Sequence, residues 1–536
     1  MAKQSKEARH WADVTAERIV RQRGERDRYV LAAGITPSGT VHFGNMREII
    51  TPELVVRALR RLGYGVRFIY LWDDYDRFRK VPSGLPGDGW ERYVGVPLSE
   101  IPDPYGAAAS YAGHFAGVFE QEMARLGIEP EWISQAEMYG SGVYAEGVRT
   151  ALQHRQRLRA LLDRQRTTPL PAEWWPVEVY CACGAGAAGT GVAGWDGAYE
   201  LTYRCAACGA ERAADLRRGD GVKLGWRVDW PMRWAHHAVD FEAAGKDHHT
   251  AGGSWETAAP IVGEVFGASP PATLKFDWIN VRGVGTMASS SGQLISPADA
   301  LAVYQPEVVR YLFARTRPDR EFEISFDLDV LKTYEDYDRA GRICRGTEQA
   351  SAARRAREGR AIELSEVAPE QPLPAEQVEV SFRHLCSLLQ IHDGDIDGVV
   401  RSLCDDAGCG RLHDRACRAW HWITTHAPEG FRFRLRDPGA SPVPVSAPVG
   451  AAVAGLRERL ASAQRSAGAD APDAKVLHQA IYDVAATHGM EARELFTELY
   501  RILIDKDRGP RLAEFIVTIG VSRIDPLLAN VTVCDE

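Results

Sequence analysis

Residues 28–74 read RYVLAAGITPSGTVHFGNMREIITPELVVRALRRLGYGVRFIYLWDD. The apolar run at the start ends in Gly34 and indicates a buried parallel strand. A glycine-containing turn follows, and the next stretch has the pattern of a helix that ends at Gly63. A second apolar run then ends in Asp73 and Asp74. Strand, turn, helix and strand make a βαβ unit, which predicts a doubly wound parallel sheet that binds its ligand at the carboxyl ends of the strands.

The rest of the chain extends this α/β pattern and then leaves it. A helix is expected before the first strand, from Glu7 to about Arg23. An insertion interrupts the pattern between residues 147 and 220, and from about Leu301 the segments are predicted to be helical. Two proline-rich stretches predict linkers between the helical groups: 369–376 and 437–451.

Composition and charge are those of a globular chain of 536 residues, enough for about three domains. The sequence contains no stretch of about 20 apolar residues that would predict a membrane span. The N-terminus lacks the apolar core of a signal peptide, so we expect a cytoplasmic protein. The net charge of −9 argues against a protein that coats nucleic acid, although a local basic face can still bind RNA. Runs of arginine at 149–166 and 354–360 are ordinarily solvated faces, and only other motifs would favour contact with phosphates.

Four of the ten cysteines form a cluster with short spacings: Cys181, Cys183, Cys205 and Cys208. A C-x-C pair and a C-x₂-C pair separated by 21 residues indicate a structural Zn²⁺ site, because four thiolates leave no open position on the metal. Buried thiols or a degenerate site are the alternatives. The other six cysteines do not suggest a disulfide framework, and each is predicted to be a small buried apolar residue.

The turn TPSGTVHFGN, residues 36–45, lies between the first strand and its helix. Its glycines allow the backbone to approach a nucleotide, and the start of a helix favours phosphate charge. His42 could donate a hydrogen bond to phosphate oxygens as negative charge develops on them. The alternative is a tight turn with a capping histidine.

Acidic residues follow the second strand, where Asp73, Asp74 and Asp76 would face the ligand crevice. Carboxylates in that place suit a cationic group such as an amine of a substrate. The alternative is that Asp73 or Asp74 caps the start of a helix.

Two later stretches also suit a nucleotide. The first is GKDHH at 245–249, followed by Gly252 and Gly253, in which small residues again permit close approach. A metal site at His248 and His249 is disfavoured, because neighbours in a strand point to opposite faces. The second is the serine-rich stretch GTMASSSG at 285–292, which could close over a triphosphate or could be an ordinary flexible loop.

Together these motifs resemble those of the class I lysyl-tRNA synthetases. The resemblance runs in the same order through most of the chain and is weakest in the insertion and at about 360–480. Among the stretches that carry it are GITPSGTVHFGNMRE, FIYLWDDYDRFRKVP, WRVDWPMRWA, DFEAAGKDHHTAGGSWE and LYRILIDKDRGPRL. It implies an α/β Rossmann-type catalytic domain, an inserted connective and zinc-bearing subdomain, and an all-α C-terminal domain that binds the anticodon.

The resemblance assigns five segments to the chain. They are the N-terminal helix with the first half of the Rossmann-type domain at 1–146, the insertion at 147–220, the second half of the Rossmann-type domain at 221–285, the signature loop with helices that contact the tRNA stem at 286–345, and the anticodon-binding domain at 346–536.

The implied reaction is lysine–tRNA ligation. L-lysine and ATP, with Mg²⁺, give lysyl-adenylate, and the lysyl group then passes to tRNA(Lys). The resemblance favours a monomer, and no membrane or DNA partner is expected. Two alternatives remain: a catalytically impaired paralogue that binds tRNA or lysine, and another nucleotidyl transferase that carries the same signature turn.

Site roles follow from the positions that match the family and from the residue chemistry described above. The expected catalytic residues lie in the two signature segments: His42, Asn45, Thr286, Ser289 and Ser290. The residues expected to bind ATP or the adenylate are Thr36, Ser38, Gly39, His42, Gly44, Asn45, Gly252, Gly253 and Met287. The residues expected to bind lysine are Gly34, Thr36, Asp73, Asp74, Trp226, Trp230 and His248.

One position departs from the family pattern. The family's second signature begins with a lysine, and here Thr286 stands in its place, with no lysine elsewhere in the loop. A lysine there would stabilise the triphosphate as charge develops, so its loss is expected to slow activation. Cations elsewhere could compensate: Lys246, Arg282, Arg77 or Arg79.

Overall fold

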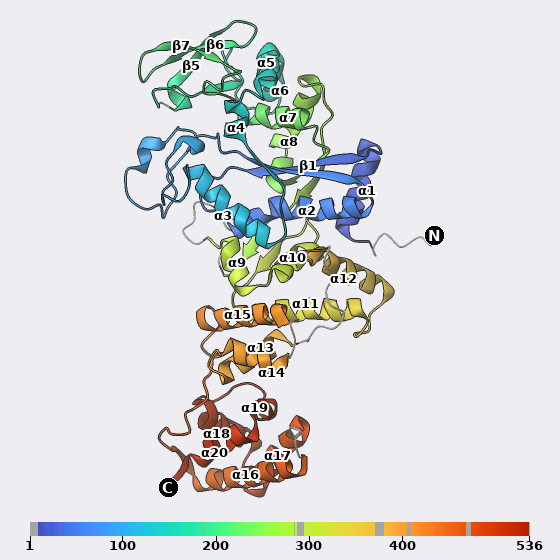
Figure 1. The fold of residues 1–536 in the computed structure, drawn as a ribbon, viewed down its shortest axis with the longest axis vertical. Helices are drawn as coiled ribbons and strands as arrows, with labels where there is room; N and C mark the ends of the chain where they lie inside the picture. The colour runs from blue at the N-terminus through green and yellow to red at the C-terminus, as the bar shows by residue number, and fades with distance from the viewer. Residues whose placement is uncertain are drawn as a thin grey trace. The chain divides into compact units, whose positions relative to one another are not determined.

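The computed structural model describes residues 9–184, 186–283, 285–286, 294–369, 380–404, 409–467 and 473–534, without the side chains of 285, 286, 466 and 467. The chain divides into two compact units, which Figure 1 shows in the colours of the sequence. Unit 1 comprises Met1–Leu301, Pro306–Ile324 and Arg339–Pro372. Unit 2 comprises Ala302–Gln305, Ser325–Asp338 and Leu373–Glu536. None of the helices in the described ranges is long and apolar enough to cross a membrane.

A five-stranded parallel sheet forms the centre of unit 1. Its strands are β1 (Arg28–Ile35), β2 (Gly65–Trp72), β3 (Glu131–Ser134), β9 (Phe241–Gly245) and β10 (Ala272–Phe276). They lie in the order β10-β9-β1-β2-β3, and every pairing is parallel. The chain therefore builds from β1 toward one edge and later continues from β9 toward the other, so the topological switch lies between β1 and β9. The predicted doubly wound sheet is confirmed.

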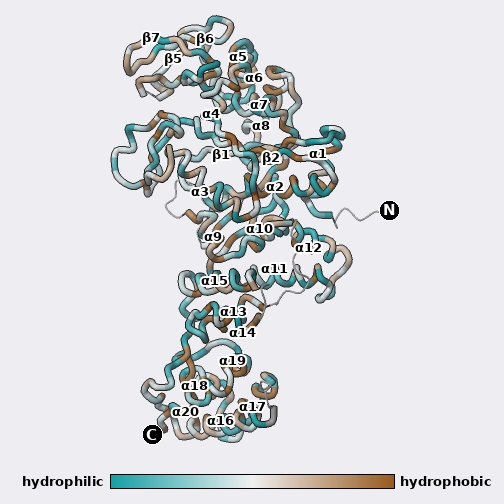
Figure 2. Tube along the Cα trace, in the orientation of Figure 1, coloured by the Kyte–Doolittle hydropathy of each residue, from teal (hydrophilic) through white to brown (hydrophobic). Residues whose placement is uncertain are grey.

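Helices cover both faces of this sheet, as Figure 1 shows. One face carries α1 (Trp11–Arg23), α2 (Met46–Arg61) and α3 (Tyr111–Arg125), and the other carries α7 (Trp226–His237) and α8 (Ser254–Glu264). Trp234 of α7 and Val262 of α8 pack with Ile69 of β2 in one buried cluster. The hydropathy colouring of Figure 2 shows hydrophobic residues along β1 and β2, where both faces are covered.

The insertion contains helices and a small antiparallel sheet. Its elements are α5 (Ala145–Gln153), α6 (Arg155–Asp163), β4 (Val177–Val179), β5 (Thr190–Trp195), β6 (Glu200–Cys205), β7 (Glu211–Asp215) and β8 (Val222–Leu224). Strands β5, β6 and β7 form the sheet, and β4 pairs with β8. Beyond β10, unit 1 contains β11 (Ile279–Val281), β12 (Gly285–Thr286), α9 (Pro297–Val303), α10 (Pro306–Arg315), β13 (Phe322–Ile324) and α12 (Ala352–Ser365).

Unit 2 is largely helical, as predicted. Its helices are the first part of α11 (Asp329–Arg345), α13 (Phe382–Ile391), α14 (Ile396–Leu403), α15 (Gly410–Thr425), α16 (Ala447–Ala467), α17 (Ala474–Thr487), α18 (Ala492–Ile504), α19 (Leu512–Ile519) and α20 (Val521–Ala529). Most of the 369–376 linker lies outside the described residues. The prediction of a linker at 437–451 is wrong in part, because Val443–Ser446 forms β14 and pairs in parallel with β15 (Val531–Cys534). That pairing joins segments far apart in the sequence, which local pattern cannot predict.

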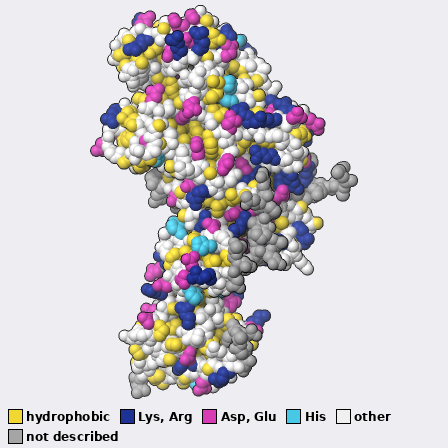
Figure 3. Space-filling model, in the orientation of Figure 1, with side chains coloured by type: hydrophobic (Ala, Val, Ile, Leu, Met, Phe, Trp, Pro, Cys, Tyr) yellow, Lys and Arg dark blue, Asp and Glu magenta, His cyan; other side chains and the backbone are white. Residues whose placement is uncertain are grey.

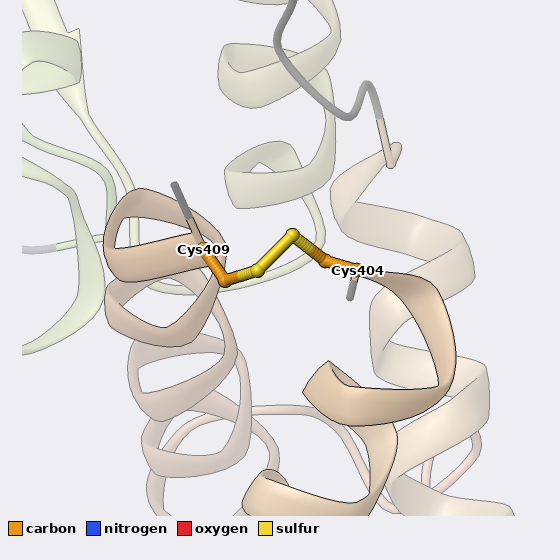
Figure 4. The surroundings of a disulfide bond; sticks show 2 residues. All are labelled: Cys404 and Cys409. Atoms are coloured by element: carbon orange, nitrogen blue, oxygen red, sulfur yellow. A yellow bond between two sulfur atoms is a disulfide. The ribbon is translucent and has the colours of Figure 1, made fainter. Parts of the chain in front are cut away.

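A disulfide joins the facing ends of two helices in unit 2. Cys404 follows α14 and Cys409 precedes α15, and their Cα atoms are 6.1 Å apart (Figure 4). The prediction of buried thiols is therefore wrong for this pair. It is also wrong for Cys344 and Cys534, which are exposed, whereas Cys386 is buried as expected. Composition alone could not reveal that helix ends place two of these residues side by side.

Candidate active site

The predicted site residues gather at the carboxyl edge of the sheet, on both sides of the switch. Thr36 follows β1, Asp73 follows β2, and the short helix η6 (Lys246–His249) follows β9. The Asp73 N–H donates to the Ile35 carbonyl at 3.0 Å, which extends the pairing of β1 and β2 into the loops. Three neighbouring strands thus deliver polar residues to one crevice, as the topology requires.

The HFGN turn opens α2 and fixes His42 at the edge of this crevice. The His42 N–H donates to Asn45 Oδ1 at 3.3 Å, so the Asn45 side chain has a capping role in the turn. Phe43 is fully buried against Phe313, with ring centroids 5.8 Å apart. His42 is buried, and its Nδ1 has no hydrogen-bond partner among the described residues. Because burial also lowers the pKa of His42, the ring is a neutral imidazole able to meet a ligand oxygen.

Backbone geometry explains several of the predicted glycines. A Cβ on Gly34 would lie 2.3 Å from the Leu71 carbonyl oxygen, and one on Gly253 would lie 2.5 Å from the His248 carbonyl oxygen. Gly252 has a φ of +74°, which favours glycine. A Cβ on Gly39 would make only ordinary contacts, the nearest to Pro82 at 3.7 Å. Gly34 and Gly253 therefore serve close packing of the backbone, whatever ligand they also contact.

The first loop is held by neighbouring side chains. The Thr36 hydroxyl donates to Asp76 Oδ2 at 3.2 Å. The Ser38 carbonyl accepts from the Tyr111 hydroxyl at 2.9 Å. The predicted nucleotide-binding loop is thus positioned from both sides.

Aromatic residues form a wall at the β9 side of the crevice. Trp226 and Trp230 of α7 are stacked, with ring centroids 5.1 Å apart. The His248 ring lies 5.6 Å from Trp230 and 6.2 Å from Trp226, measured between centroids. The structure therefore brings together three residues predicted to bind lysine. Such a wall suits the methylene chain of a substrate that carries a cation at its end.

The aspartates after β2 already have partners within the protein. Arg233 of α7 donates to Asp73 Oδ1 at 2.6 Å, and Lys223 donates to Asp76 Oδ1 at 2.5 Å. Asp229 connects the two cations, with 3.4 Å to Arg233 Nε and 3.7 Å to Lys223 Nζ. Although burial opposes ionisation, the ammonium of Lys223 lowers the pKa of Asp76. The sequence analysis missed this network. The signal that could have indicated it is Asp229 and Arg233, a pair of opposite charges one turn apart between the tryptophans of α7.

Asp74 serves the neighbouring helix. It accepts from the Ser134 hydroxyl at 2.5 Å and from the Ala136 N–H at 2.9 Å, at the start of α4 (Gln135–Gly140). Burial raises its pKa to about 6 in spite of these hydrogen bonds. The contacts match the structural alternative, in which this aspartate caps a helix.

Two glutamates that the sequence reasoning missed lie behind the crevice. Glu242 of β9 accepts from the indole N–H of Trp230 at 3.1 Å and of Trp234 at 2.5 Å. Glu48, three residues beyond the HFGN turn, makes no side-chain hydrogen bond or ion pair with the described part of the chain. Burial, Glu242 and Asp247 raise the pKa of Glu48 well above its ordinary value. These surroundings favour the protonated form of the Glu48 carboxyl group, and a nearby cation would favour its ionised form.

Lys246 has its charge compensated. Its ammonium lies 2.5 Å from Asp277 and 3.0 Å from Glu321, over the Trp278 ring at 4.2 Å from the centroid. It is therefore poorly placed to replace the lysine missing from the signature loop. The predicted roles of Met287, Ser289 and Ser290, and of the Thr286 side chain, lie outside the described residues.

The four clustered cysteines meet in the insertion as predicted. Their sulfur atoms all lie within 4.8 Å of one another, with Cys181 and Cys208 at 3.9 Å and Cys183 and Cys205 at 3.7 Å. A tetrahedral zinc with Zn–S bonds of about 2.3 Å separates its sulfurs by about 3.8 Å. The residues present therefore fit the metal, and the tight C-x-C spacing does not prevent this geometry.

A histidine-bearing turn that opens the helix after the first strand of such a sheet is the arrangement found in class I aminoacyl-tRNA synthetases. Residues 9–368 match the family described as tRNA synthetases class I (K). The chain belongs to that family.

Relatives match over nearly the whole chain. The lysine–tRNA ligase of Treponema pallidum is 43% identical over 97% of this chain and 98% of its own. Those of Borreliella burgdorferi and Pyrococcus furiosus are 40% and 39% identical, over 97% and 95% of this chain and 99% and 97% of their own. The similarity therefore includes unit 2 as well as the sheet.

Proposed function

We propose that this chain is a lysine–tRNA ligase. The lysine carboxylate attacks the α-phosphate of ATP, pyrophosphate leaves, and a terminal hydroxyl of tRNA(Lys) then attacks the adenylate carbonyl and releases AMP. The observation that carries the proposal is the signature turn and the aromatic wall at the carboxyl edge of one sheet, in a chain similar throughout to lysine–tRNA ligases. Near them lies Glu48, whose carboxyl group makes no ion pair with the described residues.

The lysine side chain would lie along the stacked rings of Trp226 and Trp230 and bring its ammonium toward Glu48. Glu242 and Asp247 are close enough to Glu48 to raise the pKa of its carboxyl group. Asp73 and Asp76 each pair with a cation within the protein, Arg233 and Lys223, so we assign them a role in shaping the pocket. We therefore assign Asp73 and Asp74 a positioning role, in place of the expected contact with the lysine amine. Glu48 is the proposed primary partner of the lysine ammonium.

ATP would lie over the first loop and the start of α2. The unpartnered Nδ1 of His42 supports a contact with a phosphate oxygen, where negative charge increases as pyrophosphate leaves. A Cβ on Gly252 would meet no atom within 4 Å, so the backbone there is open to a nucleotide. Mg²⁺ would accompany the triphosphate. We further propose that the four cysteines bind a structural Zn²⁺. The protein is proposed to be a monomer and to act in the cytoplasm.

One feature favours a second candidate, a tRNA-binding paralogue with impaired catalysis. It is the threonine at position 286, where the family pattern has a lysine. No observation favours a nucleotidyl transferase of another kind.

Charging assays test the proposal. Purified protein, Mg²⁺ and ATP are incubated with transcripts of tRNA(Lys) and tRNA(Glu) and with each radiolabelled amino acid in turn. We expect lysine alone to be attached, and only to tRNA(Lys). Charging with another amino acid would refute the assignment, and tRNA binding without any charging would favour the second candidate.

A further inference from the structure

Lys223 is a buried cation at the end of the insertion. Lysine and arginine side chains are scattered over the face of the molecule that Figure 3 shows, interspersed with acidic ones. The side chain of Lys223 differs, because only 4% of it is exposed. It belongs to β8, shortly before Trp226 opens α7 and the aromatic wall. Because a buried ammonium is costly without a partner, its charge requires an acidic group nearby.

The main partner of Lys223 is Asp76, in the loop after β2. The ammonium donates to Asp76 Oδ1 at 2.5 Å, and Asp229 Oδ2 lies 3.7 Å from the same nitrogen. Burial opposes the charge on Lys223, but these two aspartates and Asp73 raise the pKa of its ammonium. Burial also opposes the charge on Asp76, but Lys223 lowers the pKa of that carboxyl group. Both partners are therefore ionised at neutral pH.

The second oxygen of the same carboxylate binds a hydroxyl of the first loop. Thr36 directly follows β1, and its hydroxyl donates to Asp76 Oδ2 at 3.2 Å. An ionised carboxylate can only accept hydrogen bonds, so the hydroxyl must donate its single proton to Asp76. The Thr36 oxygen then has only lone pairs to offer, and it makes no other side-chain hydrogen bond with the described residues. It is an acceptor ready for an N–H group.

The charge of Lys223 sets this direction. A protonated Asp76 could donate to the Thr36 oxygen, and the hydroxyl proton would then be free for an acceptor such as a carboxylate. An ionised Asp76 excludes that arrangement. One buried ammonium on the insertion thus determines whether a loop residue two strands away suits a donor or an acceptor.

The proposed reaction indicates which donor reaches Thr36. Its lysine places the ε-ammonium toward Glu48 and the carboxylate at the α-phosphate, over the first loop. The α-ammonium is attached to the carbon next to that carboxylate, so it must lie beside the first loop as well. An ammonium has three N–H donors and no acceptor, and it therefore needs acceptors such as the Thr36 oxygen.

We propose that Lys223 and Asp76 are positioning residues that hold the Thr36 hydroxyl as a hydrogen-bond acceptor for the α-ammonium of the amino acid. They act through Thr36 and do not touch the substrate. The inference rests on the proposed function for the identity of this amine.

A double-mutant cycle on lysine-dependent ATP–pyrophosphate exchange tests the proposal. We expect Thr36→Val and Lys223→Met each to raise the KM for lysine about tenfold, the size of one hydrogen bond to a charged group. The kcat should stay within about twofold, because the α-ammonium is bound alike before and during the reaction. Since Lys223 acts through Thr36, the double variant should also lose about tenfold, and not about 100-fold. Thr36→Ser, which retains the hydroxyl, should keep the wild-type KM.

A ligand without the α-amine gives an independent readout. The compound ε-aminocaproate has the carboxylate and the ε-ammonium of lysine but no α-ammonium. Its inhibition constant against lysine should therefore be the same in the variants and in the wild-type protein, whereas a general distortion of the pocket would weaken both ligands.

Two further variants serve as controls. Lys275→Met is matched to Lys223→Met, since Lys275 is an exposed lysine on the edge strand β10, and it should leave the KM unchanged. If Lys223→Met does not fold, Lys223→Gln combined with Asp76→Asn removes the two opposite charges together, and we expect the same tenfold rise in KM from it.

Three results would overturn the proposal: additive losses in the double variant, an unchanged KM in Thr36→Val, or equal losses of affinity for lysine and ε-aminocaproate. Any of them beside normal wild-type exchange leaves the proposed function standing. Absence of wild-type exchange with lysine counts against that function instead, and calorimetric binding of lysine to the same variants then provides the readout for Thr36.

Discussion

At the scale of single residues, substitution of Glu48 tests the proposed lysine pocket most directly. Its carboxyl group has two acidic neighbours and no ion pair with the described residues, whereas Asp73 and Asp76 pair with Arg233 and Lys223. We predict that Glu48→Gln raises the KM for lysine about 10- to 100-fold, the size expected for a lost charged hydrogen bond. Steady-state charging kinetics measure it.

The matched control is Glu122→Gln on α3, whose carboxylate pairs with Arg125 at the surface. The raised pKa of Glu48 adds a signature. Binding of the lysine ammonium must lower that pKa, so lysine binding should release a proton, and affinity should rise with pH until Glu48 is ionised in the free enzyme. Calorimetry in buffers of different ionisation enthalpy detects the proton. An unchanged KM with no proton release would remove Glu48 from the pocket.

The departure at position 286 gives a second prediction at this scale. Restoring a cation with Thr286→Lys should raise kcat for lysine activation, by about tenfold if it resembles other single groups that stabilise developing charge. Rapid-quench measurement of adenylate formation isolates that step. A slower or unchanged step would mean that another group already supplies the charge.

Residue roles were only partly predictable. The turn around His42 and the tryptophans of α7 could be found because sequence motifs carry them. Glu48 is the last residue of the motif GITPSGTVHFGNMRE. The neighbouring sequence does not reveal which charged groups the fold places around its carboxyl group. The pairing of Asp73 with Arg233 joins positions 160 residues apart, and only the assembled sheet brings them together.

At the scale of elements, the cysteine cluster of the insertion is predicted to hold one zinc. Cys208 is the cleanest position to change, because it is exposed, whereas Cys181 and Cys205 belong to a buried core. Cys208→Ser should reduce zinc from about one per chain to well below that, measured by mass spectrometry of the purified protein, and should lower the melting temperature. Cys344→Ser, at an exposed cysteine outside the cluster, is the control. A wild-type protein purified without zinc and unable to bind it would contradict the assignment.

A buried ion pair in unit 1 links α10 to α2, α12 and the end of α3. Arg310 of α10 is fully buried, donates to Glu53 of α2 at 2.7 Å, and donates to the carbonyls of Leu126 at 3.1 Å and Leu364 at 3.0 Å. Arg310→Met would leave Glu53 Oε2 and these carbonyls without their donor, although Arg57 would still pair with Glu53 Oε1 at 2.5 Å. We therefore predict a loss of about 3 kcal/mol in the free energy of unfolding. Denaturant titration measures it. Arg317→Met, at an exposed pair with Asp319, should cost less than about 1 kcal/mol, and equal losses would contradict the prediction.

Elements were more predictable than their pairings. The βαβ unit follows from apolar runs and glycines, which are local signals. Strand β14 and the disulfide between α14 and α15 were missed, because each depends on a partner that the surrounding sequence does not indicate.

At the scale of the whole molecule, the chain combines an overall acidic charge with a basic cavity in unit 2, whose wall carries Arg383, Arg432, Lys506, Arg508 and Arg511. The net charge therefore argues against non-specific binding of nucleic acid, while a local positive potential can still attract one RNA segment. The family and the fold class could be predicted because motifs occur in order along most of the chain, and the family match confirms both. The cavity could not be predicted from the sequence, because its wall is formed by segments that lie far apart along the chain.

The most direct measurement is ATP–pyrophosphate exchange by the purified protein, with each amino acid in turn, in the presence and absence of tRNA(Lys). It reports the first step of the proposed reaction and depends on the turn, the aromatic wall and the loop with Thr286 together. We predict exchange with lysine and with no other amino acid. Exchange that depends on a different amino acid, or none under either condition, would contradict the assignment of this chain as a lysine–tRNA ligase.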